Sequence, residues 1–303
     1  MSDSAQRYLQ AARRASTQRR YAQAIDHFEG EWGGLLPASS ESIVRYLAAY
    51  GALLSSSTLR THLAALAQWH SEHGFADPTK AARVRDTLRG IQAEHPQPVQ
   101  QAAVLALQDL ETCVGGLEVE LMSTKPTLRL RAARDRALIL LGFWRAFRGD
   151  ELCRLQVEHI KLNVGEGLEI YLASSKTDRG NRGRILIMPA LKRLCPVVAY
   201  EHWLAASGLQ RGPVFRAIDR WGHVGEQALN ANSISRVLRQ AFARSGAPNS
   251  SYSGHSLRRG FATWASRNQW SHKALMDYVG WRDVQSAARY IEADAPFGEW
   301  ARR

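Results

Sequence analysis

Two prolines one residue apart, Pro96 and Pro98, limit the folding of this chain more than any other feature of its sequence. Proline lacks a backbone N–H and holds the residue before it in an extended conformation, so a helix cannot run through this segment. The surrounding residues are mostly polar, and we interpret 94–102 as a linker. A chain of 303 residues has room for two domains. The sequence therefore predicts a first domain over 1–93 and a second over 103–303.

Apolar residues in the first 93 positions recur at the spacing of helices. They lie three or four residues apart in two runs, at 43, 47, 50 and 54 and at 59, 63 and 66. Hydroxyl side chains at 55–58 separate the runs and suit the start of a helix, as does Asp77 followed by Pro78. An earlier helix is expected over 4–28, ending near Gly30. Together these segments predict a four-helix bundle.

The second domain is expected to be mostly helical with one β interruption. Residues 132–144 form a strongly apolar segment, which predicts a buried helix. Segments 167–172 and 184–188 are typical of strands, and the polar, glycine-containing stretch 174–183 between them predicts a hairpin turn. Further helices are expected from about residue 190 to the chain end, broken near 207–213 and 246–254. The predicted fold class is mainly α with a small β-sheet (α+β).

The charge balance indicates a polyanionic partner. The chain has 40 lysines and arginines against 28 acidic residues, a formal net charge of +12, and only six of the 40 are lysines. Arginine donates planar, bidentate hydrogen bonds to phosphate, so the bias favours nucleic acid. The alternative is a solvated surface encoded by a GC-rich genome.

Several common sites and locations are excluded or disfavoured. The sequence lacks the P-loop, HExxH, GxSxG and GxGxxG patterns, which argues against ATP-driven, zinc-protease, hydrolase and dinucleotide chemistry. Cys113, Cys153 and Cys195 lie too far apart for a metal knuckle or a disulfide framework. The sequence contains no run of 18 or more apolar residues, so no membrane-spanning helix is predicted. The N-terminus does not have the pattern of a secretory signal, so a cytoplasmic location is expected.

Two of four local patterns carry a single basic residue each. Arg148 joins the apolar helix to a short segment beginning with Asp150 and Glu151, where a guanidinium can enter a cleft while an acidic neighbour orients it. The alternative is a charge pair at a helix end. Lys176 lies in the predicted hairpin turn, from which it can reach into a groove. The alternative is a solvated turn lysine.

The other two patterns lie nearer the carboxyl end. His255 and Arg258 are three residues apart, so they share one face of a helix, and Gly254 before them suits a helix start that favours an anion. An HxxR pattern by itself also arises by chance. Trp281 follows a glycine, and Tyr290 comes nine residues later. The alternative for both aromatic residues is a place in the core.

In their order and spacing, the four patterns resemble the tyrosine recombinase (phage integrase) family, in its simple two-domain Cre/Xer-like type. The resemblance covers residues 127–291, and residues 1–93 are similar to the family's DNA-clamping core-binding domain. Most members have histidine where Trp281 stands, whereas the Cre subgroup has tryptophan. An indole N–H can donate to a phosphate oxygen but cannot shuttle a proton, which excludes a general-acid role for Trp281.

The resemblance implies how the candidate residues divide the reaction. Tyr290 is expected to attack a scissile DNA phosphate, forming a 3′-phosphotyrosyl link and freeing a 5′-hydroxyl. Arg148 and Arg258 are expected to bind the non-bridging oxygens, with Trp281 supporting the phosphate. Two guanidiniums offset the negative charge of the transition state without a metal or any other cofactor.

The resemblance also implies roles for three further groups. His255 is expected to hydrogen-bond the phosphate and accept the tyrosine proton, and Lys176 to protonate the leaving 5′ oxygen. Glu151 is expected to hold the geometry of the site. Because the phosphotyrosine keeps the energy of the broken bond, religation needs no ATP.

The implied partner is double-stranded DNA with a specific target site. Arg83, Arg85 and Arg89 are candidate DNA contacts, and a merely solvated helix face is the alternative. By resemblance, a homotetramer forms on DNA from monomers or dimers, and the tail 291–303 anchors on a neighbouring protomer. The chain begins almost directly with core-binding helices, so no arm-binding domain is expected.

Two other functions share these features. One is a DNA-binding regulator of the same fold that has lost recombination. The other is a type IB topoisomerase-like enzyme, which shares the chemistry but relaxes DNA without strand exchange. A complete set of six candidate catalytic residues argues against the regulator, and the short two-domain chain favours the recombinase over the topoisomerase.

Overall fold

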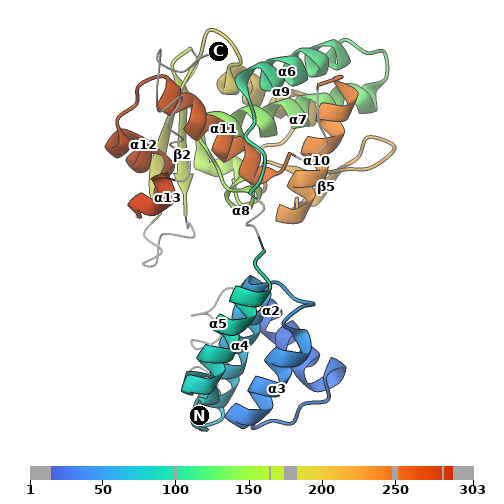
Figure 1. The fold of residues 1–303 in the computed structure, drawn as a ribbon. Helices are drawn as coiled ribbons and strands as arrows, with labels where there is room; N and C mark the ends of the chain where they lie inside the picture. Colours follow the sequence, from blue (N-terminus) through green and yellow to red (C-terminus); the bar gives the residue numbers. More distant parts are fainter. Residues whose placement is uncertain are drawn as a thin grey trace. The chain divides into compact units, whose positions relative to one another are not determined.

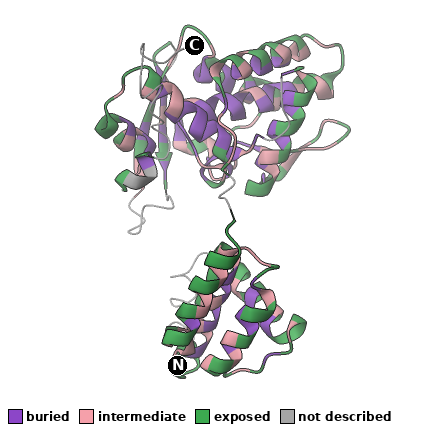
Figure 2. Ribbon diagram, viewed as in Figure 1, coloured by how far each residue is buried: buried purple, intermediate pink, exposed green. Residues whose placement is uncertain are grey.

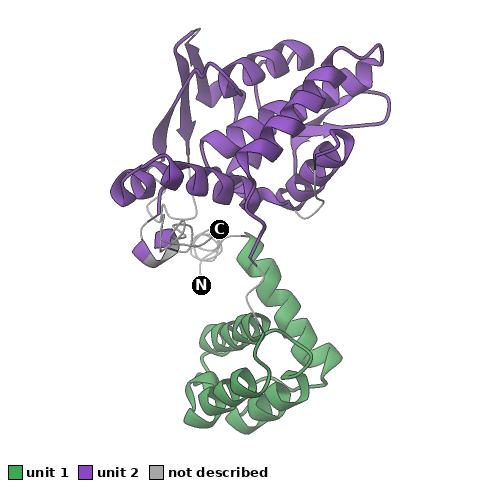
Figure 3. Ribbon diagram, turned by 45° about the horizontal axis from the view of Figure 1, so that its top comes forward, with its two compact units in different colours: residues 1–100 green, residues 101–303 purple. Residues whose placement is uncertain are grey.

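The computed structural model describes residues 15–97, 101–163, 165–173, 183–247, 252–281 and 283–288. The chain forms two compact units, residues 1–100 and 101–303 (Figure 3). The division falls within the segment 94–102. Two of the candidate catalytic residues, Lys176 and Tyr290, lie outside the described residues.

Unit 1 is helical over its described residues (Figure 1). Its α-helices are α2 (Ala15–Asp26), α3 (Ser40–Tyr50), α4 (Ser56–Glu72) and α5 (Ala82–Glu94), with a π-helical turn His27–Glu31 and a 3₁₀ turn Pro78–Lys80. The hydroxyls of Ser39 and Ser55 accept hydrogen bonds from backbone N–H groups in the first turns of α3 and α4, which explains why these helices begin there. Helix α2 packs on α4, and α3 on α5.

A small aromatic core holds unit 1 together. Phe28, Ile43, Tyr46 and Leu59 are fully buried, and the Tyr46 hydroxyl shares a hydrogen bond with His27 Nδ1 at 2.9 Å. Burial raises the pKa of Tyr46, with a smaller contribution from Tyr50. The assignment of this unit as a four-helix core-binding bundle stays a prediction.

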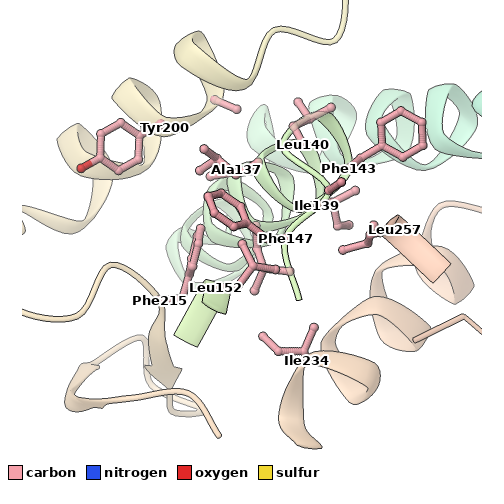
Figure 4. Packing of buried hydrophobic residues seen from close by; sticks show 14 of the residues in the cluster. Ala137, Ile139, Leu140, Phe143, Phe147, Leu152, Tyr200, Phe215, Ile234 and Leu257 are labelled. Atoms are coloured by element: carbon pink, nitrogen blue, oxygen red, sulfur yellow. The ribbon is translucent and has the colours of Figure 1, made fainter. Parts of the chain in front are cut away.

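Unit 2 is built around α7 (Pro126–Trp144). The other described α-helices are α6 (Leu107–Leu121), α8 (Gly149–Cys153), α9 (Pro196–Ser207), α10 (Ala231–Arg244), α11 (Gly254–Arg267), α12 (His272–Val279) and α13 (Val284–Ala288). Helices α6, α9, α10 and α11 all pack on α7, so its residues from 132 to 143 are buried nearly all round (Figures 2 and 4). Most of these buried residues are apolar, and the buried charges of Arg134 and Asp135 pair with each other, so the predicted buried helix is confirmed.

A three-stranded antiparallel sheet lies within unit 2, in the order β1 (Ile160–Asn163), β2 (Gly167–Leu172) and β3 (Arg184–Pro189). Ile170 of β2 pairs with Ile160 on one side and Leu186 on the other. The two predicted strands are confirmed. Strand β1 was not predicted. It is only four residues long, so it shows no clear alternation of apolar and polar residues.

The expectation that only helices follow residue 190 is wrong. Strands β4 (Arg216–Ile218) and β5 (Val224–Ala228) form a second antiparallel pair, and Gly222 in their turn has a φ of 98°. These strands are three and five residues long and mostly exposed, so they lack the β-branched alternation that marks a half-buried strand. The mainly α fold class with small β-sheets is confirmed. In the part of the chain that the structure describes, no helix has the length and apolar character to cross a membrane.

Candidate active site

A sharp turn between α7 and α8 places Arg148. The turn passes through Ala146, which is buried and has a φ of 52°, in the left-handed region that residues with a Cβ seldom adopt. Phe147 is buried beside it and anchors the turn in the core. Arg148 then becomes the N-cap of α8. The backbone of the turn is thus held in the core by Ala146 and Phe147. The guanidinium of Arg148 lies at the edge of that core.

Glu151 holds Arg148 by two hydrogen bonds. Its Oε1 accepts from Arg148 Nη1 at 2.7 Å, and its Oε2 accepts from the Arg148 backbone N–H at 2.9 Å. Glu151 is only 1% exposed, against 17% for the Arg148 side chain. Burial alone raises the pKa of Glu151, but the backbone N–H of Arg148 and the charges of Arg148 and Arg258 outweigh it and bring the pKa below its usual value. Glu151 is therefore a buried carboxylate that fixes the direction of Arg148.

Replacing Glu151 with glutamine tests this function through pH. Because the folded-state pKa of Glu151 is lowered, its charge stabilises the protein above the unfolded-state pKa, about 4.3, and this contribution is lost as pH falls through the folded-state value. We expect Glu151→Gln to lower the free energy of unfolding by about 1.5–3 kcal/mol at pH 7. Denaturant unfolding of both proteins between pH 3 and 7 should show this difference shrinking below pH 4.3. A difference that stays constant over that range would contradict the assignment.

Arg258 ties three segments of the site together. It is 3% exposed and lies in the second turn of α11, from which Nη1 donates to the Ala146 carbonyl at 2.8 Å and Nη2 to the Val279 carbonyl at 3.0 Å. Its guanidinium carbon also lies 5.3 Å from the centre of the Trp281 ring. Because it binds the carbonyl of Ala146, two residues before Arg148, Arg258 lies close to the Arg148–Glu151 pair. Arg258 therefore holds the turn before Arg148 and the end of α12 in place.

Trp281 is placed by the glycine before it. Gly280 ends α12 with a φ of 75°, and a Cβ at this position would lie 2.4 Å from Arg184 Nη1. The left-handed φ is what favours glycine here, since the near atoms belong to the movable end of the Arg184 side chain. The turn at Gly280 is followed directly by Trp281, whose half-buried indole lies against Arg258.

His255 lies at the mouth of the same site. It is exposed in the first turn of α11, and its neighbour Gly254 packs against Gly149, where an added Cβ would be 3.4 Å from the Gly149 Cα. The first turns of α11 and α8 therefore meet beside Arg148. The N-terminus of α11 adds partial positive charge to a site that already holds two guanidiniums. This combination favours the binding of a phosphate group.

A supporting contact here was not predicted from the sequence. Arg145 lies 4.0 Å from the centre of the Tyr278 ring and donates to the Tyr278 carbonyl, and the Tyr278 hydroxyl donates to the Trp144 carbonyl at 2.8 Å. Burial, with a smaller contribution from the nearby charge of Arg184, lowers the pKa of Arg145 to about 10, so Arg145 stays protonated at neutral pH. This contact joins the end of α7 to the end of α12, beside the two carbonyls that Arg258 binds. The sequence does not indicate this contact, because Arg145 and Arg148 lie in one short segment and either could make it.

The structure thus brings together four predicted residues, Arg148, Glu151, Arg258 and Trp281, with His255 at the edge. The positions of Lys176 and Tyr290 stay predictions, since both lie outside the described residues.

The three DNA-contact candidates lie on α5 of unit 1, and all are exposed. Arg83 pairs with Glu41 at 2.7 Å and Arg89 pairs with Asp86. Exposed pairs of this kind are weak, so a phosphate can replace the carboxylate.

Possible metal ligands and the three cysteines lie among the described residues. In that part of the chain, no three histidine, cysteine or acidic side chains are grouped to hold a metal ion. Cys113, Cys153 and Cys195 are free and buried, and burial raises the pKa of Cys113 and Cys153 to about 12.

Comparison with known proteins agrees with this arrangement. The chain is 29% identical to an integrase/recombinase XerD homolog of Selenomonas ruminantium over 262 residues, which cover 85% of this chain and 74% of the relative. It is 24% identical to the recombinase Cre of Escherichia phage P1 over 277 residues, 86% of this chain and 77% of the relative. The structure of a lambda integrase dimer bound to a COC′ core site has a similar fold, with a TM-score of 0.60 at 16% identity over 96% of this chain and 93% of that one.

Fold and site together describe a mainly helical domain in which Arg148 and Arg258 lie close to one another. The model of the phage integrase family matches residues 118–296, more than half of the sequence, and this chain belongs to that family. The resemblance identified from the sequence motifs is confirmed.

Proposed function

We propose that this protein is a site-specific DNA recombinase that cleaves and rejoins DNA through a 3′-phosphotyrosyl intermediate. The observation that carries the proposal is the place of Arg258, which binds the carbonyl of Ala146 and so lies beside Arg148 and its buried partner Glu151, although Arg148 and Arg258 are 110 positions apart in the sequence. Such a pair suits a phosphodiester, whose non-bridging oxygens gain negative charge in the transition state. The relatives in the same family are named as recombinases and integrases.

The residues share the reaction as follows. Arg148 and Arg258 bind the non-bridging oxygens, and Trp281 donates its indole N–H to the same phosphate. The phenolic oxygen of Tyr290 attacks phosphorus, and the bond to the 5′ oxygen breaks. His255 accepts the phenolic proton, and Lys176 gives a proton to the leaving 5′ oxygen. The reverse attack by a 5′-hydroxyl restores the phosphodiester and frees Tyr290, so the bonds balance without ATP.

The partner is duplex DNA with a specific target, bound by both units. Arg83, Arg85 and Arg89 of α5 contribute phosphate contacts from unit 1. Recombination between two sites requires four protomers on DNA, and the tail 291–303, with Phe297 and Trp300, anchors each protomer on its neighbour. The lambda integrase structure, a dimer bound to a core site, supports assembly on DNA. The protein acts in the cytoplasm, on DNA of the nucleoid.

The test is capture of the covalent intermediate. Duplexes that the protein binds are selected from a random-sequence pool and then rebuilt with a nick, so that cleavage releases a short strand and cannot reverse. We expect an adduct that survives SDS and forms in EDTA without ATP, with the DNA attached to the peptide that contains Tyr290. Tight binding with no adduct would favour the regulator, and relaxation of supercoiled plasmids that lack the target would favour the topoisomerase-like enzyme.

A further inference from the structure

A second arginine-rich site lies in unit 2, between α7, β4 and α10. It is a cavity of about 350 Å³. Its lining includes four arginines from the two helices and one acid: Arg131, Arg134, Asp135, Arg236 and Arg244. A cavity of this volume is large enough for a phosphate group with its attached sugar or waters.

The floor of this cavity is electrically balanced and rigid. Asp135, 1% exposed, accepts from Arg134 Nε and Nη2 at 2.9 and 2.7 Å, and from Arg244 Nη2 at 3.0 Å. Arg244 also donates to Glu120 at 2.8 Å, and Arg134 Nη1 donates to the Arg216 carbonyl at 3.2 Å. Two cations and two anions cancel here. The charges of Arg134 and Arg244 are therefore already neutralised by Asp135 and Glu120. An anion bound in the cavity would have to pair with other arginines.

The remaining two arginines supply uncompensated charge. Arg131 donates to the backbone carbonyl of Asp219 at 2.8 Å, while the carboxylate of Asp219 accepts from the backbone N–H groups of Trp221 and His223 and pairs with the His223 ring. Arg236 is exposed. Within the described ranges, neither Arg131 nor Arg236 has a carboxylate at ion-pair distance. Two guanidiniums at one cavity without an anion are suited to a phosphate.

Helix α10 adds neutral donors on the same side. Ser233, Arg236, Gln240 and Arg244 all line the cavity, and their spacing of three and four residues puts them along one stripe of the helix. The hydroxyl of Ser233 and the amide of Gln240 can each donate to a phosphate oxygen. The stripe therefore offers both charge and directional hydrogen bonds.

This cavity shares no lining residue with the candidate active site. The two places are neighbours in unit 2, because Ile234 of α10, which follows the cavity-lining Ser233, packs against Gly149, the residue after Arg148. A duplex carries a phosphate for about every 3.4 Å of rise on each strand. One bound duplex can therefore present a phosphate to each place.

We propose that the cavity between α7, β4 and α10 is a second phosphate site, in which Arg131 and Arg236 bind a phosphodiester. Its expected source is the backbone of the DNA duplex on which the protein acts, which rests on the proposed function. A free phosphate would use the same chemistry. In either case the site binds and positions its ligand and takes no part in strand cleavage.

The test compares three single substitutions, Arg131→Gln, Arg236→Gln and Arg239→Gln. Arg239 is the matched control, because it is exposed on the same helix but does not line the cavity. Binding of a selected duplex is measured from low to moderate salt. Loss of one phosphate contact should reduce the slope of log affinity against log salt by about 1 for Arg131→Gln and Arg236→Gln, and leave the control unchanged.

Two further measurements separate the possible results. At saturating protein, the Arg131 and Arg236 variants should still form the covalent adduct, so failure of this proposal is distinct from failure of the proposed function. Inorganic phosphate that raises the melting temperature of the wild type but not of these variants, with unchanged DNA slopes, would support the site with a free ligand. Slopes and phosphate responses equal to those of Arg239→Gln would overturn it. Arg236→Gln remains decisive if Arg131→Gln loosens the β4–β5 turn.

Discussion

Tyr290→Phe is expected to abolish the SDS-resistant adduct while leaving duplex affinity within about threefold of the wild type. Phenylalanine keeps the ring but has no oxygen to attack phosphorus, so the loss should be complete rather than partial. Affinity depends mainly on phosphate contacts by arginine, which the substitution does not touch. The measurement is gel analysis of the nicked duplex after denaturation, together with binding to the intact duplex.

Tyr278→Phe provides the comparison for this result. It makes the same chemical change 12 positions earlier and removes the hydrogen bond from the Tyr278 hydroxyl to the Trp144 carbonyl. We expect the adduct to form with this variant, more slowly if the junction of α7 and α12 loosens. An adduct that persists in Tyr290→Phe and disappears in Tyr278→Phe would reassign the nucleophile.

The electrostatics of the site explain why a tyrosine can serve at neutral pH. A free tyrosine has a pKa near 10 and is a poor nucleophile at pH 7. Two guanidiniums and the N-terminus of α11 favour a phenolate held near them. They also reduce the repulsion between an anionic nucleophile and a phosphodiester. In the proposed reaction, the same charges bind the phosphate and ease the attack on it.

Parts of this site could be predicted because the residues involved are close in sequence. Arg148 and Glu151 are three positions apart at a helix start, where one turn brings their side chains together. His255 and Arg258 share a face of α11 for the same reason. The glycine before Trp281 was also a visible signal, because the left-handed backbone that ends α12 at Gly280 favours glycine.

The remaining parts depend on long-range contacts that leave no local pattern. Arg258 binds the carbonyls of Ala146 and Val279, and any residue type supplies a carbonyl, so neither partner can be recognised from its identity. The contact of Arg145 with Tyr278 joins segments 133 positions apart. Strands β4 and β5 were missed because they are short and exposed. The sequence therefore indicated candidate residues for the site, but not the long-range contacts that hold the described ones in place.

Arg258→Lys is the second substitution from which we expect a large effect. Arginine uses Nη1 and Nη2 to bind the carbonyls of Ala146 and Val279, and its planar group carries five N–H donors in a fixed arrangement. Lysine has one nitrogen, which cannot span both carbonyls and reach the phosphate as well. We expect single-turnover cleavage of the nicked duplex to slow by about 10²–10³-fold at saturating protein.

Arg259→Lys is the matched control, because Arg259 is the next residue of α11, is also buried, and also donates to a backbone carbonyl, that of Ala102. Both substitutions remove a buried charged hydrogen bond, so both should lower the free energy of unfolding by about 1–3 kcal/mol. Only Arg258→Lys should slow cleavage, because only Arg258 lies beside Trp281 and the Arg148–Glu151 pair. Equal cleavage rates for the two variants would mean that Arg258 supports the fold alone, and the phosphate would then have to be held by Arg148 without it.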